Sequence, residues 1–81
     1  MVLITKSVLS NNKLIDCVVL DGPNHGISIA GGSGHLIAGC TITNAAVDGI
    51  FVSVASGVTI EENLISGTGL EGIEVVSSGN I

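Results

Sequence analysis

Short runs of apolar residues alternate with polar residues, and these runs recur at a fixed spacing along the chain. The tetrapeptide Gly-Ile-Phe-Val at 49–52 has one counterpart at 26–29 and another at 72–75, at equal distances before and after it. Within each run the apolar side chains follow the two-residue period of a β-strand, and a helical period never continues beyond one turn. The pattern therefore predicts three short strands of about three to four residues in each repeat, joined by turns.

A repeat of this length indicates a solenoid, because repeats of about 20–50 residues stack on one another to bury a continuous core. Three strands and no helix per repeat predict an all-β fold, a parallel β-helix of about three coils of about 23 residues. Neighbouring coils would lie about 4.8 Å apart and pair in parallel, so that equivalent residues stack into ladders. We divide the chain into an irregular or partial first coil at 1–9, repeats at 10–32, 33–55 and 56–77, and the start of a further coil at 78–81.

The repeat is imperfect near both ends of the sequence. Strict repetition would place Lys6 at the position of Ile29, which faces inward, so we expect the register to break within residues 1–9. The run Val-Leu-Ile at 2–4 still predicts a strand, because it is apolar and rich in β-branched residues. Aligning Ser78 with Ser56 gives a spacing that is one position too short, so we expect the third repeat to have lost a residue.

Four ladders of aliphatic residues are expected to form the core. They are Ile27/Ile50/Ile73, Ile29/Val52/Val75, Leu14/Ile37/Ile60 and Val19/Ile42/Ile65. Because β-branched side chains stack well on a pleated surface, we assign these ladders a structural role. Another ladder, Gly26/Gly49/Gly72, precedes the first strand of each repeat, where glycine suits a bend or a positive φ.

Cys17 and Cys40 are one repeat apart and share a turn ladder with Asn63. Their spacing follows the repeat and matches no zinc or redox motif. Stacked Cα atoms about 4.8 Å apart would just allow a disulfide, but side chains that point the same way make its dihedral angle awkward. We therefore expect free thiols that pack as small buried apolar groups.

The sequence Ile-Glu-Glu-Asn-Leu-Ile-Ser-Gly at 60–67, followed by Gly72 and Ile73, resembles the repeat of the pectin-lyase-like superfamily of parallel β-helices. That superfamily includes pectate lyases, polygalacturonases, alginate epimerases and phage tailspikes. The resemblance covers roughly residues 14–81 and is specific for the fold but not for the function. It implies a right-handed single-stranded coil with Gly-Ile-x-Val as its first strand, x-Thr-Ile as its second and Asn63 in the tight turn.

The net charge of −5, with two lysines and no arginine, excludes a nucleic-acid-binding surface, because no basic stripe can neutralise phosphates. It also disfavours direct capture of acidic polysaccharides unless a cation bridges the two. The uncharged stretch 22–47 is interrupted every few positions by glycines and polar residues, so we expect no membrane span. The first residues, Met-Val-Leu-Ile-Thr-Lys, lack the pattern of a signal peptide, and the compartment stays open.

The ladder His25/Asp48/Glu71 is the first candidate for chemistry, and we interpret it as a catalytic group. It stands beside the strand that lines the substrate groove in enzymes of the resembling superfamily. A carboxylate beside an imidazole can orient it and raise its pKa, and adjacent acidic residues can share a cation or a proton. The alternative is a row of solvated polar residues before a turn glycine. No cofactor or metal is required by the sequence, although some members of the superfamily use Ca²⁺.

The ladder Ser28/Phe51/Glu74 is the second candidate, as a substrate-binding or interface surface. Alternation from Ile50 points these residues outward, which would expose the one aromatic side chain of the sequence. Such a ring can fill a subunit interface or stack on a sugar. A local shift of register that buries Phe51 is the structural alternative.

Repeat proteins need caps that cover their terminal strands, and this sequence has no recognisable cap. Strand edges that stay open can pair with another chain. The first hypothesis is therefore a structural module that forms homo-oligomers by end-to-end stacking or trimer packing, within a larger tailspike-like or polysaccharide-associated protein. The second is a fragment of a lyase, hydrolase or epimerase that acts on acidic glycans, and the third is a carbohydrate-binding surface without catalysis. Whether the chain is an enzyme stays open, although the resemblance implies groove lysines, arginines and Asp pairs that have no counterpart here.

Overall fold

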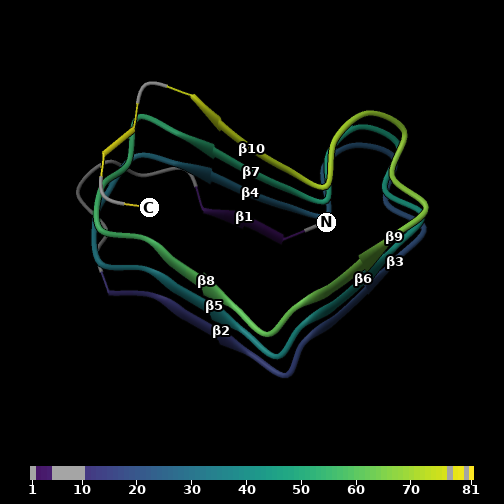
Figure 1. Cartoon of the computed structure of the whole chain (residues 1–81), viewed down its shortest axis with the longest axis horizontal. Coiled ribbons are helices and arrows are strands. Elements are labelled where there is room, and N and C mark those ends of the chain that lie inside the picture. Colours follow the sequence, from purple (N-terminus) through teal and green to yellow (C-terminus); the bar gives the residue numbers. More distant parts are fainter. Residues whose placement is uncertain (1, 5–10, 77, 80) are drawn as a thin grey trace.

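Ten short strands of the computed structural model, which describes residues 2–4, 11–76, 78–79 and 81, form three parallel sheets. One sheet has the order β1 (Val2–Ile4), β4 (Ile27–Ala30), β7 (Ile50–Ser53) and β10 (Ile73–Val76). The second contains β2 (Lys13–Ile15), β5 (Leu36–Ala38) and β8 (Thr59–Glu61). The third contains β3 (Val18–Leu20), β6 (Thr41–Thr43) and β9 (Leu64–Ser66). Figure 1 shows these sheets as the walls of a stack of coils, and the predicted all-β parallel β-helix is confirmed.

The register between neighbouring coils keeps the predicted repeat length through the middle of the chain. Ile27 pairs with Ile50 and Ile50 with Ile73 in the first sheet, while Ile37 pairs with Ile60 in the second. The third sheet follows the same offset. Since every pair joins equivalent residues, the four predicted core ladders are present.

Near the ends the register departs from the sequence expectations. Val2 lies opposite Ile27, a wider offset than elsewhere in this sheet, so that Ile4 stands opposite Ile29. Lys6, which strict repetition would place there, lies outside the described residues. At the other end Ser56 pairs with Gly79, which keeps the full repeat length, so the expected loss of one residue is wrong. A match between two serines misled the alignment, whereas the ladder register follows the backbone count.

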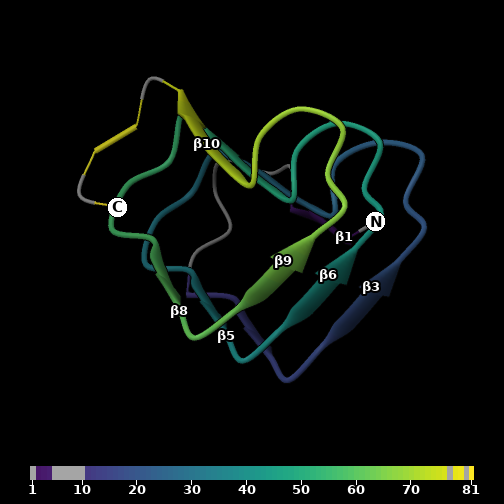
Figure 2. The same ribbon diagram turned by 45° about the vertical axis from the view of Figure 1, so that its right-hand side comes forward.

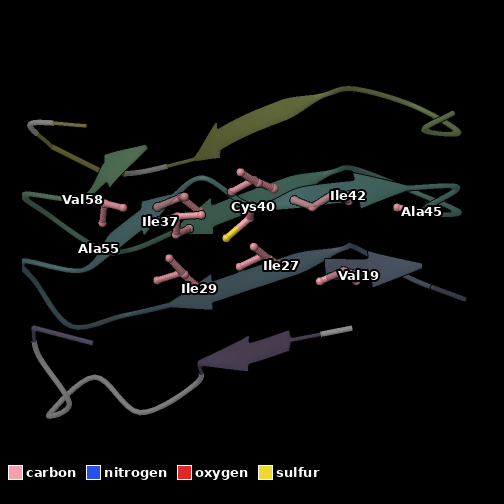
Figure 3. Close-up of a cluster of buried hydrophobic side chains, with 11 residues drawn as sticks. Val19, Ile27, Ile29, Ile37, Cys40, Ile42, Ala45, Ala55 and Val58 are labelled. Atoms are coloured by element: carbon pink, nitrogen blue, oxygen red, sulfur yellow. The ribbon is translucent and has the colours of Figure 1, made fainter. Parts of the chain in front are cut away.

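The core is a column of aliphatic side chains enclosed by the three sheets. Its centre is fully buried, and Figure 3 shows the side chains projecting into the space between the strands. Members of the predicted ladders account for most of it, namely Val19, Ile27, Ile29, Ile37, Ile42, Ile50 and Val52. Their equivalents in β10, Ile73 and Val75, are 48% and 43% exposed, because no further described strand packs on β10.

Corners of the coil carry residues with positive φ, and these positions also recur once in every repeat. One such ladder joins Asp16 (φ 55°), Gly39 (65°) and Glu62 (55°). Two others are Asn11/Gly34/Gly57 and Asp21/Asn44/Gly67. Glycine, asparagine and aspartate tolerate this left-handed region better than other residues, which is why they hold every position of these three ladders except Glu62. Val54, with φ 54°, is a β-branched exception at a corner where the equivalent residue is Gly31.

The ladder Gly26/Gly49/Gly72 has a different role from the one expected, because none of these glycines has a positive φ. A Cβ at Gly26 would collide with the Ile42 side chain and lie 2.6 Å from the carbonyl oxygen of Gly49. A Cβ at Gly49 would collide with Ile65 in the same way and lie 2.6 Å from the carbonyl oxygen of Gly72. These glycines therefore permit the close approach of successive coils, whereas a Cβ at Gly72 would meet nothing within 4 Å.

The turn ladder Cys17/Cys40/Asn63 joins coils by side-chain hydrogen bonds. Asn63 accepts from the Cys40 backbone N–H through Oδ1 (2.7 Å) and donates through Nδ2 to the carbonyl of Ile37 (3.1 Å). One coil below, the Cys40 thiol takes the place of that donor and reaches the carbonyl of Leu14 at 3.4 Å. Both cysteines are free thiols, as predicted.

Candidate functional site

The candidate site lies where three equivalent loops stack along one side of the coils. These loops, at 21–26, 44–49 and 67–72, connect the third sheet to the first, and Figure 2 shows them rising beside one another. Each ends with a polar residue followed by glycine: His25, Asp48 and Glu71. The backbone fixes their register, since Gly26 N donates to the Asp48 carbonyl (2.9 Å) and Gly49 N donates to the Glu71 carbonyl (3.0 Å).

Side chains of this ladder bond to the coil above. The His25 imidazole accepts at Nδ1 from the backbone N–H of Asp48 (3.3 Å), and the Asp48 carboxylate accepts at Oδ1 from the backbone N–H of Glu71 (3.2 Å). Each residue therefore holds the next one in place, and the structure brings the predicted catalytic group together as one ladder.

Asp48 is the most unusual member, because its side chain is wholly buried. Its Oδ2 is the one buried side-chain polar atom, among the described residues, that has no hydrogen-bond partner. The His25 Nδ1 atom lies 3.4 Å from this oxygen, but a neutral imidazole that accepts from the Asp48 N–H at Nδ1 cannot donate from the same atom. An Nδ1–H imidazole would satisfy Oδ2, but the Asp48 N–H would then lose its acceptor.

Phe51 packs against His25 from the neighbouring coil. The two rings are stacked, with their centroids 4.5 Å apart and an interplanar angle of 7°. Phe51 stands between Ser28 and Glu74 in the register, as predicted, so no local shift occurs. However, Phe51 is only half exposed and Ser28 is buried, whereas the alternation placed this row outside. The outward direction does not ensure exposure here, because one face of the ring is covered by His25.

The two candidate ladders meet in a cluster of three carboxylates. Oxygen atoms of Asp48, Glu71 and Glu74 lie within 4.8 Å of one another. A hydrogen bond with the Asp48 carboxylate raises the pKa of Glu74, and desolvation and the charges of Asp48 and Glu71 act in the same direction. The repeat pattern of the sequence had placed Glu71 and Glu74 in separate ladders. Their closeness in the chain, on either side of the Gly72 turn, was the signal that could have joined them.

A second histidine, His35, was not singled out by the sequence. It is buried at a core position, where Nε2 lies 3.2 Å from the Gly31 carbonyl and Nδ1 accepts from the Asn12 backbone N–H (3.3 Å). Since Nε2 can donate while Nδ1 accepts, both ring nitrogens are satisfied by a neutral imidazole. His35 is therefore a structural residue.

The chemistry open to the site is limited by its shape. The described residues enclose no pocket, and Asp48 is too deeply buried to contact a large substrate directly. The carboxylate cluster can share a proton or bind a cation, and the His25–Phe51 stack offers a flat, partly exposed surface. No helix formed by the described residues has the length and apolar character needed to cross a membrane.

Comparison with known proteins agrees with this architecture. The model of the family described as "right handed beta helix region" matches residues 2–81, nearly the whole chain. No curated protein and no solved structure matches this chain. The match adds the hand of the coil to the parallel sheets and their ladders, and the chain belongs to the right-handed β-helix family.

Proposed function

We propose that this chain is a structural β-helix module that associates with copies of itself end to end, the β10 end of one copy lying against the first coil of the next. The observation that carries the proposal is the open layer at β10. Ile73 and Val75 occupy positions that are fully buried in the coil below, yet they are 48% and 43% exposed. Exposed aliphatic residues at core positions favour burial by another surface.

A second copy is the occupant that fits this layer best, because the described coils from β2 to β10 repeat one register. The offset between paired residues is constant from β4 to β10, so a coil placed on β10 would continue the existing ladders. Gly72 leaves the same room that Gly26 and Gly49 provide between coils inside the chain. The outer edge of β10 also carries backbone groups without a strand partner among the described residues, and such edges pair readily in parallel.

The contact would be heterologous, joining two different ends, so repeated association would extend the solenoid. The resemblance to the pectin-lyase-like superfamily, which includes phage tailspikes, supports a place for this module in a larger tailspike-like or polysaccharide-associated protein. In that setting the stack would supply a rigid rod.

The test is the mass of the protein as a function of concentration, by sedimentation equilibrium from about 1 to 100 μM, a range in which weak to moderate interfaces dissociate. We expect a reversible increase in mass for the unmodified chain and a monomer for Ile73→Lys, which places a charge in the open layer. Leu64→Lys is the matched control, because Leu64 lies in β9 of the same end coil but is 64% exposed on its outer wall, whereas Ile73 continues a core ladder. A monomer at every concentration, or equal disruption by Leu64→Lys, would refute end-to-end stacking.

A second candidate is action on acidic glycans by His25, Asp48 and Glu71. The contact of 3.4 Å between the His25 imidazole and the Asp48 carboxylate favours it, because a carboxylate can orient an imidazole for proton transfer. Turnover of a panel of acidic glycans, lost in His25→Ala and in Asp48→Asn, would support this function. Absence of turnover, or turnover that both variants retain, would exclude it.

A further inference from the structure

Three carboxylates from two adjacent coils are held together by the backbone. Asp48 ends the loop before β7, Glu71 ends the equivalent loop before β10, and Glu74 is the second residue of β10. The register of the coils stacks Glu71 on Asp48, and the Glu71 N–H donates to Asp48 Oδ1 at 3.2 Å. Glu74 reaches the same point from the strand, so the oxygens of all three lie within 4.8 Å of one another.

The second observation is the unpaired oxygen of Asp48. This carboxylate is 0% exposed, and its Oδ2 receives no hydrogen bond from the described residues. Burying an unpaired carboxylate oxygen is unfavourable, because the water that would solvate it has been removed. His25 Nδ1, at 3.4 Å, already accepts from the Asp48 N–H, and the neighbouring Glu74 carboxyl group can donate to Asp48 only while it is protonated. A ligand that accepts electron pairs from oxygen would satisfy this atom.

Charge leads to the same conclusion. Three acidic groups converge within a chain whose net charge is −5. The contact between His25 and Asp48 is the one ion-pair contact within the described part of the chain, and it balances the cluster only if the imidazole is protonated. Lys13, the lysine among the described residues, belongs to β2 in a different sheet. The cluster therefore has a strong local excess of negative charge.

We propose that Asp48, Glu71 and Glu74 bind a calcium ion at the loop side of β10. All three ligands are carboxylate oxygens, which hard divalent cations prefer, whereas zinc favours sites with nitrogen or sulfur. Ca²⁺ accepts oxygens at about 2.3–2.6 Å, so two ligands on opposite sides of one ion are at most about 5 Å apart. The separation of 4.8 Å or less satisfies that limit.

Calcium fits this cluster better than magnesium. Mg²⁺ requires nearly ideal octahedral geometry, whereas Ca²⁺ takes six to eight oxygens in a flexible arrangement. Glu71 is exposed and Glu74 is half exposed, so water can complete the coordination on the outer side while Asp48 closes the inner side. With only three protein side chains, we expect a Kd of about 10⁻⁴ to 10⁻³ M, the range of weak extracellular calcium sites. The site is complete within one copy of the chain and does not depend on self-association.

Isothermal titration calorimetry of the chain with CaCl₂ at neutral pH tests the proposal. We expect one saturable site. Glu71→Gln and Glu74→Gln should each weaken calcium binding at least about tenfold, since each removes a charged ligand. Glu61→Gln is the matched control, because Glu61 is an exposed glutamate of β8 in another sheet. Its substitution removes one negative charge, as Glu71→Gln and Glu74→Gln do. Circular dichroism checks that each variant keeps its β structure, and calcium should raise the unfolding temperature of the unmodified chain and of Glu61→Gln alone.

Three results would overturn the proposal. The first is the absence of saturable binding at millimolar calcium in the folded, unmodified chain. The second is binding that Glu61→Gln weakens as much as Glu74→Gln does, since this would indicate a diffuse charge effect. The third is equally tight binding of Mg²⁺, which would contradict the assignment to calcium.

Discussion

Substituting alanine at two glycines of one ladder tests how closely the coils approach each other. Gly49 and Gly72 are equivalent residues, and neither has a positive φ, so alanine is compatible with the backbone at both. They differ only in what lies above them. At Gly49 a new Cβ would collide with the Ile65 side chain and lie 2.6 Å from the Gly72 carbonyl oxygen, whereas at Gly72 it would meet nothing within 4 Å.

The magnitude follows from these surroundings. Overpacking costs about 1–3 kcal/mol, and Gly49→Ala belongs at the upper end because one colliding atom is backbone. The Gly72 carbonyl also accepts from Ile50 N at 2.8 Å, so moving it weakens a hydrogen bond worth about 1 kcal/mol. Alanine restricts the unfolded chain and returns about 0.4–1 kcal/mol at either site. We expect Gly49→Ala to lower the free energy of unfolding by about 2–3 kcal/mol, and Gly72→Ala to raise it by about 0.5 kcal/mol.

Urea unfolding followed by circular dichroism measures this difference, at a concentration where sedimentation shows a monomer. The expected gap of about 3 kcal/mol is a large share of the roughly 5–15 kcal/mol of a typical domain, so the midpoints should separate clearly. The slope of unfolding free energy against urea should stay the same in both variants. Equal stabilities within about 0.5 kcal/mol would refute the close approach of the coils at Gly49.

The other predictions concern a corner, a turn and a thiol. Val54→Asn should raise the free energy of unfolding by about 1 kcal/mol, because asparagine tolerates the positive φ of 54° that valine adopts there, and no gain in thermal unfolding would contradict this strain. Asn63→Ala should lower it by about 1–3 kcal/mol, because the Cys40 N–H and the Ile37 carbonyl both lose their partner, and an unchanged urea midpoint would argue against these bonds. Burial and the neighbouring Cys40 thiol raise the pKa of Cys17, so its thiolate forms at a higher pH than in the unfolded chain. Iodoacetamide labelling of Cys17, mapped by mass spectrometry, should therefore reach its half-maximal rate at a higher pH in the folded protein than in urea, and coincident pH profiles would contradict the shift.

Core ladders could be predicted from the sequence because the backbone repeats. A constant offset between coils places Ile27, Ile50 and Ile73 in one column, independently of their side-chain conformations. Alternation along a strand then determines which side chains face inward. The glycine ladder was found by the same offset, but its role was misjudged. Composition favoured a positive φ, whereas the observed cause is contact with the next coil, which depends on the distance between coils.

The candidate site was only partly predictable for a related reason. The offset identified both polar ladders, His25/Asp48/Glu71 and Ser28/Phe51/Glu74, but it gives no information on contacts between neighbouring columns. The stacking of His25 on Phe51 and the convergence of the three carboxylates depend on how side chains lean across the wall. The burial of Asp48 likewise results from coverage by the surrounding chain, which no residue-by-residue pattern contains.

In this fold the chemical environment of a wall residue is set mainly by the residues one coil above and below it. The same backbone position holds an imidazole at His25, a buried carboxylate at Asp48 and an exposed carboxylate at Glu71. The imidazole and the buried carboxylate each accept a hydrogen bond from the backbone N–H of the equivalent residue in the next coil. The core and corners keep the spacing constant, so a change at one wall position alters the partner of its neighbour without altering the fold. It follows that the wall next to β10, where an acidic column adjoins Glu74, can acquire a charged site while the same wall near β4 carries a stacked ring pair.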